Sequence, residues 1–423
     1  MKNIRKNHNR KIVVGILAGA MILASATAVS AAGFGSRTAM GTGNQTFGAR
    51  MTGGMTETYT AKTNALSYAD LTGGITAADA LFSKRDLKQE ADLTEAQYIK
   101  VTDGATIEIS EAGVYVLSGT AANCTVKITA DKEAKIQLVL DGVSITNDNF
   151  PAIYVVSADK VFVTTTEGSE NTLSVTGAFK ADGETNTDAV IFSKEDLVLN
   201  GKGTLSIVSA QGNGITAKDD LKITGGTLNV TSALDGLEAN DSIVMYNGSI
   251  TVNSKKDGLH AENDEDDSLG YIWIGGGTLK VTASDDAIHS TSFVQIDGGA
   301  VTVSGAEGIE GTYIQINDGE IAITATDDGI NAANKSSAYE TAIEIAGGTL
   351  SVTVGQGDTD AVDSNGNIYV AGGTVSVTAQ MSSFDYDGSA TYTGGTIIVN
   401  GVTQSGIPAA GMGMMGGMGF GRR

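Results

Sequence analysis

Residues 221–253 read LKITGGTLNVTSALDGLEANDSIVMYNGSITVN, and this stretch decides the fold. Short runs such as LKIT and TLNVTS alternate apolar and polar residues, which is typical of β-strands with one buried face. A glycine placed immediately before a strand of this kind recurs nine times between Gly203 and Gly395, at intervals of 20 to 29 residues, most of them close to 22. The sequence beyond Asp188 is therefore a repeat of short strands and tight corners.

A period near 22 residues without a helix predicts the coils of a parallel β-helix, each stacked about 4.8 Å above the last. A β-propeller would need roughly twice this period, and a leucine-rich repeat has its own spacing of Leu and Asn. The two intervals of 29 residues predict insertions at fixed corners of the coil. We therefore predict an all-β solenoid of the parallel β-helix class.

The chain divides by composition into five parts. We predict a signal peptide at 1–31, a Gly/Met-rich flexible segment at 32–75, an N-terminal β segment at 76–147 that leads into the solenoid, the β-helix itself at 148–403, and a second Gly/Met-rich tail at 404–423.

The first part has the layout of an export signal. Five basic residues precede an apolar run from Ile12 to about Val29, and Val29-Ser30-Ala31 offers the small residues that signal peptidase requires for cleavage after Ala31. A retained membrane anchor is the alternative. No later run is long and apolar enough to span a bilayer, so cleavage predicts a secreted protein without a membrane partner.

Charge and cysteine content exclude several classes of function. The 423 residues carry 27 Lys+Arg against 49 Asp+Glu, a net charge of −22, which argues against a nucleic-acid partner because phosphate binding needs a basic surface. One cysteine, Cys124, excludes an internal disulfide framework and a Cys-rich metal site.

Acidic residues recur at the corners of the repeat. In a solenoid a repeated position becomes a column, and carboxylates 4.8 Å apart repel by about 3–4 kcal/mol at an effective dielectric of 20. Hard oxygen donors without thiols indicate calcium (Ca2+) rather than zinc. Asp and Asn also cap turns without any metal, so this alternative stays open for each single corner residue. The candidate calcium ligands are Asp235, Asp257, Glu262, Asp264, Asp266, Asp267, Asp285, Asp286, Glu307, Asp327 and Asp328.

A second column is aromatic. Strand alternation in YIWIGGG, FVQIDGG and YIQINDG points Tyr271, Phe293 and Tyr313 outward, with Trp273 outward one step along. Aromatic rings in a row on a surface would stack against sugar rings, and we predict carbohydrate binding by these four residues. The alternative is that the rings cover each other or are covered by an insertion.

The order of several short motifs resembles the clostridial-type carbohydrate-binding β-helix family over about residues 80–400. The motifs are FSKRDL (82–87), LVLDGVSITN (138–147), PAIYV (151–155), IFSKEDL (191–197), GNGITAKDDLKITGGT (212–227) and HAENDEDDSLGYIWIGGGT (260–278). The resemblance implies a secreted, right-handed parallel β-helix that carries calcium and binds cellulose and acidic, pectin-like polysaccharides such as polygalacturonate. It also implies a fold similar to that of calcium-dependent pectate lyases.

Three functions remain open on this basis. The first is a secreted, calcium-binding, non-catalytic protein that binds plant cell-wall polysaccharide. The second is a calcium-dependent polysaccharide lyase, for which Lys255 and Lys256 would supply the base for β-elimination. The third is a cell-surface adhesin or structural β-helix whose calcium serves rigidity alone.

Overall fold

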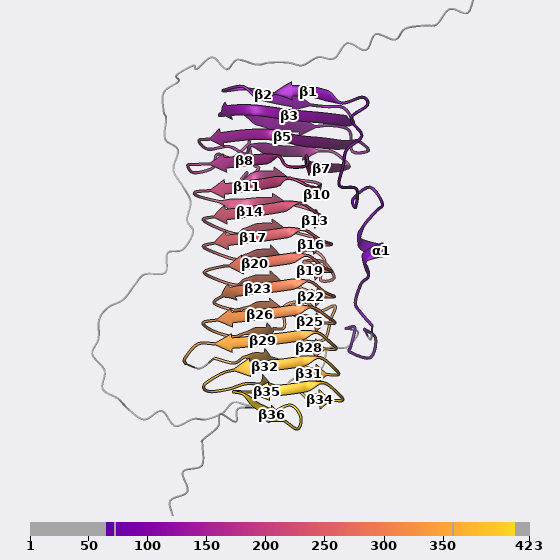
Figure 1. Cartoon of the computed structure of the whole chain (residues 1–423), viewed down its shortest axis with the longest axis vertical. Helices are drawn as coiled ribbons and strands as arrows, with labels where there is room; N and C mark the ends of the chain where they lie inside the picture. Colours follow the sequence, from indigo (N-terminus) through magenta and orange to yellow (C-terminus); the bar gives the residue numbers. More distant parts are fainter. Residues whose placement is uncertain (1–64, 72, 358, 411–423) are drawn as a thin grey trace, which may run out of the picture.

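The computed structural model describes residues 65–71, 73–357 and 359–410, and these residues form the parallel β-helix that the repeat predicts (Figure 1). Each coil contributes one strand to each of three faces, here called faces 1, 2 and 3. The predicted signal peptide, most of the predicted Gly/Met-rich segment and the end of the predicted tail lie outside the described residues. None of the helices among the described residues has the length and apolar character needed to cross a bilayer.

Face 1 is built from parallel strands stacked in register. Its strands are β1 (Gln97–Lys100), β7 (Lys160–Thr165), β10 (Asp196–Gly201), β13 (Asp220–Ile223), β16 (Ser242–Met245), β19 (Tyr271–Ile274), β22 (Phe293–Ile296), β25 (Tyr313–Ile316), β28 (Ala342–Ile345), β31 (Asn367–Val370) and β34 (Ala390–Tyr392).

Face 2 follows face 1 in each coil, and β3 (Gly113–Ala122) and β5 (Lys135–Asn147) are long enough to span both faces. The other strands of face 2 are β8 (Glu170–Val175), β11 (Thr204–Ser209), β14 (Thr227–Ser232), β17 (Ser249–Ser254), β20 (Thr278–Thr282), β23 (Ala300–Gly305), β26 (Glu320–Ala325), β29 (Thr349–Val354), β32 (Thr374–Thr378) and β35 (Thr396–Val399). The last strand, β36 (Val402–Gln404), pairs antiparallel with β35.

Face 3 closes each coil as a separate sheet of short strands. Its strands are β2 (Thr106–Ile109), β4 (Thr125–Thr129), β6 (Ile153–Ser157), β9 (Ala189–Ser193), β12 (Asn213–Ala217), β15 (Leu237–Ala239), β18 (Leu259–Ala261), β21 (Ile288–Ser290), β24 (Ile309–Gly311), β27 (Ile330–Ala332), β30 (Val362–Ser364) and β33 (Asp385–Tyr386).

The core is a set of aliphatic columns inside the coils. On face 1, Ile243, Ile272, Val294, Ile314 and Ile343 lie directly above one another and are fully buried. Each such side chain removed from water contributes about 1.5–3 kcal/mol. Because the inward positions repeat with the coil, one apolar pattern supplies a continuous core along the whole axis.

The corner between faces 2 and 3 explains the recurring Asp-Gly pattern. A Cβ atom on Gly236 would lie 2.2 Å from Cγ1 of Val252 and 2.6 Å from the carbonyl oxygen of Gly258 in the next coil. Such contacts leave room for a hydrogen atom only, so the corner glycine is required by the close approach of successive coils.

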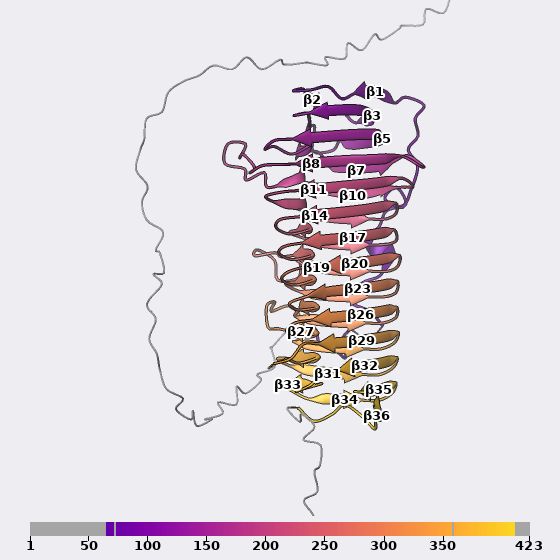
Figure 2. The same ribbon diagram turned by 60° about the vertical axis from the view of Figure 1, so that its left-hand side comes forward.

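The two 29-residue intervals correspond to insertions at one corner, as predicted. Residues 262–270 lie between β18 and β19, and residues 333–341 lie between β27 and β28. Both insertions therefore leave the solenoid where face 3 passes into face 1, and loops project from this side of the stack (Figure 2).

A segment that precedes the first coil runs along the outside of face 1, and we call it the strap (residues 65–71 and 73–89). It contains α1 (Ala78–Leu81) and lies beside the coils in Figure 1. At one end the ring of Tyr68 stacks on Tyr369 with centroids 4.1 Å apart. At the other end Oε1 of Gln89 accepts a hydrogen bond from the amide of Gly201 at 3.0 Å.

The middle of the strap is held by polar side chains of face 1. Oε1 of Gln295 accepts hydrogen bonds from the amides of Ile75 and Thr76, both at 2.9 Å, and Nζ of Lys222 donates to the carbonyl oxygen of Leu81 at 2.8 Å. The prediction that residues up to 75 form a flexible segment is therefore wrong for 65–71 and 73–75, because these residues pack on the coils.

Replacing Gln295 by Ala should loosen the strap without unfolding the coils. The variant leaves the strap amides without their acceptor, at a cost of about 1–3 kcal/mol, so the strap should open more often. We expect cleavage by trypsin after Lys84, Arg85 or Lys88 to be about fivefold faster or more. The control is Thr302→Ala on the exposed side of face 2, and equal cleavage rates for the two variants would contradict this role of Gln295.

Candidate functional site

Acidic and amide residues at the corner between faces 2 and 3 form a ladder, which is linked by hydrogen bonds from Asn213 to Asp286. Oδ1 of Asn213 accepts from the amide of Asp235 at 3.0 Å, Asp235 accepts from the amide of Asp257 at 3.0 Å, and Asp257 accepts from the amide of Asp286 at 3.1 Å. Each of these three side chains thus caps a backbone amide of the next coil rather than one of its own turn. The corner ladder comprises Asn213, Asp235, Asp257, Asp286, Glu307, Asp328 and Asp360.

Three residues beyond each corner, a second polar column follows on the outer side of face 3. Its members occupy equivalent positions in successive strands, because β15, β18, β21, β24, β27 and β30 pair in register. We call this set the face-3 column: Glu238, His260, His289, Glu310, Asn331 and Asp363.

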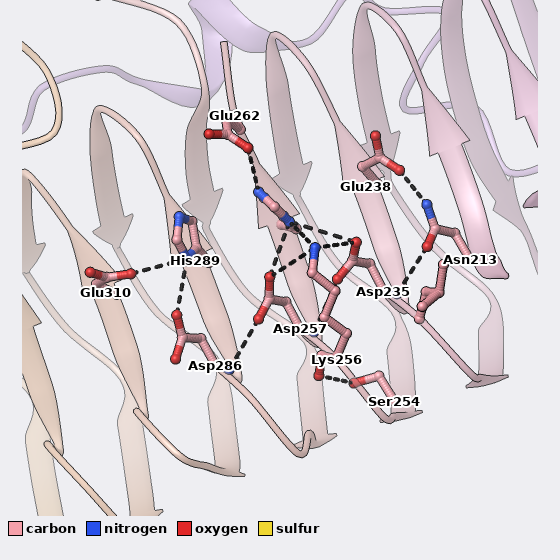
Figure 3. A network of polar contacts seen from close by, with 12 residues as sticks. Asn213, Asp235, Glu238, Ser254, Lys256, Asp257, Glu262, Asp286, His289 and Glu310 are labelled. Atoms are coloured by element: carbon pink, nitrogen blue, oxygen red, sulfur yellow. Dashed lines mark hydrogen bonds and ion pairs between the residues drawn. The ribbon is translucent and has the colours of Figure 1, made fainter. Parts of the chain in front are cut away.

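His260 joins the column to the corner ladder. Figure 3 shows the network of Asp235, Lys256 and Asp257 at this point. Its Nδ1 lies 3.0 Å from a carboxylate oxygen of Asp257, and its Nε2 lies 3.1 Å from one of Glu262. Nζ of Lys256 lies 3.0 Å from Asp235 in the same network. Burial opposes protonation of the imidazole, but hydrogen bonds to Asp235 and Asp257 raise the pKa of His260 to about 10.

His289 repeats this arrangement one coil later. Its Nδ1 lies 2.9 Å from Asp286 and 3.0 Å from Glu310, and Nζ of Lys335 lies 2.8 Å from Glu310. Burial again opposes protonation, while the carboxylates of Asp286 and Glu310 raise the pKa of His289 to about 9. Burial acts against ionisation of Glu310 too, but His289 and Lys335 lower its pKa to about 2.

The first half of the ladder is therefore neutralised by the protein itself. Three groups of side chains come close enough to hold an ion: Asp235–Asp257–His260, Asp286–His289–Glu310 and Asp257–Asp285–Asp286. In the first two, an imidazole nitrogen already contacts the carboxylates, because Nδ1 of His260 lies 3.0 Å from Asp257 and Nδ1 of His289 lies 2.9 Å from Asp286. A cation at either group would have to take the place of this imidazole contact.

The second half of the ladder lacks such compensation. Lys335 is the last Lys, Arg or His before Arg422 in the sequence. Burial and then the charges of Glu310 and Asp286 raise the pKa of Glu307 to about 8. Burial and then the charges of Asp328 and Asp360 raise the pKa of Asp363 to about 7.

The same acidic end contains an orphaned acceptor. Nδ2 of Asn331 donates to Glu307 at 3.1 Å, whereas its buried Oδ1 has no hydrogen-bond partner among the described residues. Crowded carboxylates together with a buried amide oxygen are the donor set that calcium prefers. These residues fit the ion better than Asp235 and Asp257 do. Asp327, which is exposed, lies next to Asp328 at this end.

A cavity of about 490 Å³ lies at the edge where face 3 passes into face 1, and we call it the edge cavity. Six carboxylates and two cations line it: Asp219, Glu238, Asp241, Glu262, Asp264, Glu265, Lys218 and His260. Nζ of Lys218 lies 2.8 Å from Glu238. Burial, followed by the charges of Asp196 and Asp241, raises the pKa of Asp219 to about 6.

The predicted acidic cluster at 262–267 does not converge on one point. Oδ1 of Asp266 caps the amide of Ser268 at 2.9 Å, and Asp267 contacts Ser337 of the second insertion. Only Glu262 and Asp264 among the predicted ligands of this cluster line the edge cavity. Local turns thus direct the carboxylates of this cluster to different partners, and calcium near the cluster stays a prediction.

The predicted aromatic column exists, but it is not an exposed platform. Tyr271 stacks on Phe293 with centroids 4.6 Å apart and an interplanar angle of 8°. Phe293 is 3% exposed, Tyr313 is 0% exposed, and only Tyr271 is half-buried. Tyr339 from the second insertion packs against Phe293 with centroids 5.4 Å apart.

The strap covers the remaining ring. Trp273 is 3% exposed and packs with Leu81 and Phe82 of the strap. Alternation along the strand directs these rings away from the aliphatic core, as predicted. The prediction that they stand on an open surface is wrong, since a segment without any repeat pattern lies over them.

Comparison with known proteins identifies the family. The model of the family described as carbohydrate-binding domain-containing protein matches residues 103–358 and 301–407. The chain belongs to this family. A carbohydrate-binding domain-containing protein of Acetivibrio thermocellus is 37% identical over 126 residues, which cover 29% of this chain and 44% of that relative. The match thus spans less than half of the relative's own length.

A solved structure is also similar to the chain. It is the polysaccharide lyase-like protein from C. thermocellum, as a gadolinium derivative, at 33% sequence identity and a TM-score of 0.47. The similarity covers 53% of this chain and 96% of that chain.

The lysines predicted as a lyase base lie at the corner ladder of this carbohydrate-binding domain-containing protein. Burial acts against the charge of Lys256, but its contact with Asp235 raises its pKa. Nζ of Lys256 lies 3.0 Å from Asp235, and a role of this lysine as the base of a lyase stays a prediction. Lys255 is exposed beside it.

Sequence reasoning missed the carboxylates at the other corner. Asp219 and Asp241 of this family member follow β12 and β15 and turn the chain into face 1. Their signal was present in the runs Lys218-Asp219-Asp220 and Asn240-Asp241-Ser242, which recur one coil apart.

The imidazole groups of His260 and His289 should titrate at pH values far above the range that is usual for histidine. We expect midpoints at about pH 10 for His260 and about pH 9 for His289 in an NMR titration of the imidazole protons. A raised histidine pKa stabilises the folded state fully below the unfolded value of about 6.5. This stability is lost as the pH rises through the folded values. Midpoints near pH 6.5 would show that the carboxylate contacts do not hold the protons.

Proposed function

We propose that the protein is a secreted, non-catalytic, calcium-binding protein that recognises plant cell-wall polysaccharide at the edge cavity. The observation that carries this proposal is the cavity of about 490 Å³ with its six carboxylates and two cations. Membership of the carbohydrate-binding family supports the class of ligand. Acidic, pectin-like glycans and cellulose are the candidate ligands.

The edge cavity offers both kinds of polar contact that a glycan needs. Carboxylates such as Asp241 and Asp264 accept hydrogen bonds from sugar hydroxyl groups, and charge-assisted bonds of this kind are stronger than neutral ones. Lys218 donates in return, because its ammonium group has further N–H groups besides the one that contacts Glu238. Asp241 is already oriented, because Nδ2 of Asn263 donates to its Oδ1 at 2.9 Å.

Calcium would be held by two sets of oxygen donors. One is the acidic end of the ladder, with Glu307, Asp328 and Asp363, and the other is the pair Asp219 and Asp241 in the edge cavity. In both sets the raised pKa of a carboxyl group reports crowding of negative charge that a cation relieves. When bound, calcium neutralises these carboxylates and links them to carboxylates of an acidic glycan.

Retention by immobilised polygalacturonate tests the proposal. In native affinity electrophoresis we expect retardation with calcium and loss of retardation with chelator, and no clearing of the polysaccharide. The double variant Asp219→Asn with Asp264→Asn should migrate as if its affinity were about tenfold lower or more, since it removes two charges from the cavity.

The control for this experiment is Glu320→Gln, which removes one exposed carboxylate from face 2 and should migrate like the unaltered protein. A cleared track would identify a lyase instead. Retardation that survives the double variant would place the polysaccharide elsewhere on the surface.

In the absence of calcium, the free energy of unfolding of the protein should fall as the pH rises. Carboxyl groups with raised folded pKa values favour the folded state in their protonated form, so this stability is lost as the pH rises above the unfolded value of about 4. Between pH 4.5 and 6.5, where both histidines stay protonated, we expect the chelated protein to lose about 1–3 kcal/mol of unfolding free energy. Added calcium should remove this loss.

Asp363→Asn is the matched variant for this measurement. The variant has no ionisable group at position 363. In the presence of chelator, its melting temperature should therefore fall less steeply over the same pH range than that of the unaltered protein. Identical pH profiles for the variant and the unaltered protein, with and without calcium, would contradict the assignment of calcium to this end of the ladder.

A further inference from the structure

A second cavity, of about 740 Å³, lies at the other edge of face 1, between the strap and the turns that lead into face 2. We call it the turn cavity. Its size falls within the range of about 300–1,000 Å³ that is usual for small-molecule sites. Tyr246, Asn247, Trp273, Asp297 and Asn317 line it, and its floor includes the backbone of Gly276.

The wall of the turn cavity is rigid. Nε1 of Trp273 donates to Oδ2 of Asp297 at 2.8 Å, Nδ2 of Asn317 donates to Oδ1 at 2.7 Å, and Nε2 of Gln295 donates to both carboxylate oxygens. The indole lies against the backbone of Gly275, where an added Cβ would be 1.9 Å from Cη2 of the ring. A wall fixed in this way needs no reordering when a ligand binds.

Two asparagine side chains that line the turn cavity have a hydrogen-bonding atom without a partner among the described residues. Both Nδ2 protons of Asn317 are engaged, by Asp297 and by Oε1 of Gln315, so its Oδ1 is left without a partner among the described residues. Oδ1 of Asn247 accepts from the amide of Gly248, while no described residue bonds its Nδ2. One acceptor and one donor therefore face the cavity from neighbouring turns.

The exposed aromatic ring of the cavity is Tyr246. It is 40% exposed, and its orientation is set by an edge-to-face contact with Phe82 of the strap, with centroids 5.5 Å apart and an interplanar angle of 67°. The negative face of such a ring attracts the weakly positive C–H groups of a pyranose.

We propose that the turn cavity is a binding subsite for a neutral pyranose residue of a polysaccharide, with Tyr246 as the stacking ring and Asn247 and Asn317 as hydroxyl-binding groups. The charge of the lining selects against uronic acids, because Asp297 is its one charged residue and it is negative. The inference rests on the proposed function and adds a second subsite, of different ligand charge, across face 1 from the edge cavity.

The tryptophan content of the chain provides a direct test. Trp273 is the one Trp of the sequence, so its fluorescence reports on the turn cavity alone. On titration with cellohexaose we expect a saturable change in emission, and with trigalacturonate no change. In Tyr246→Ala the cellohexaose affinity should fall about tenfold, as for truncation of an aromatic anchor. Tyr98→Ala, a control at the 72% exposed Tyr98 of β1, should bind like the unaltered protein.

A second variant keeps the test independent of strap packing. Asn247→Ala removes an exposed side chain and should weaken cellohexaose binding about threefold, with an unchanged melting temperature. The proposal is overturned if cellohexaose leaves the emission of the unaltered protein unchanged. It is also overturned if Tyr246→Ala and Asn247→Ala both bind like Tyr98→Ala, or if trigalacturonate changes the emission equally.

The two proposals fail separately. Loss of polygalacturonate retardation with a normal cellohexaose response would refute the edge cavity and support the turn cavity. Normal retardation by polygalacturonate without a fluorescence response to cellohexaose would support the edge cavity and refute the turn cavity.

Discussion

Parallel stacking of coils in register is the constraint on which the rest of the structure depends. Each residue lies about 4.8 Å from its counterparts in the coils above and below, so identical side chains become neighbours whenever the repeat is faithful. Apolar columns gain from this arrangement, as the buried aliphatic set on face 1 shows. Charged columns suffer from it, and every carboxylate of the repeat needs either a donor or a cation.

The corner ladder contains two solutions to this problem. Between Asn213 and Asp286 each side chain accepts the amide of the next coil, and Lys256 with two imidazolium groups supplies the positive charge. Beyond Lys335 the sequence supplies no further basic residue until Arg422, and burial together with neighbouring carboxylates raises the pKa of Glu307 and of Asp363 at this end of the ladder. Along its length, the corner ladder thus changes from carboxylates that contact Lys and His side chains to carboxyl groups that are crowded by other carboxylates.

The features of the fold that repeat along the chain could be predicted from the sequence, whereas the features without a repeat could not. The 22-residue period predicted the coils, the placement of both insertions and the register of Tyr271 with its neighbours, because each follows from local periodicity. The strap has no period, and nothing in residues 65–89 announces that Leu71, Leu81 and Phe82 would cover face 1. The sequence of the acidic run at 262–267 did not show where each carboxylate points, because local turns give Asp266 and Asp267 partners of their own.

The path of the strap has a consequence for the order in which the chain can assemble. Tyr68, near the beginning of the described chain, stacks on Tyr369 near its end, about three hundred residues away, while Gln89 reaches the early coils. Such contacts are of very high sequence separation and form late in folding. The strap is made before the coils but can dock completely only after the last coils exist. It then joins coils that otherwise touch only their immediate neighbours, so that loosening at one end of the solenoid is resisted by contacts made at the other.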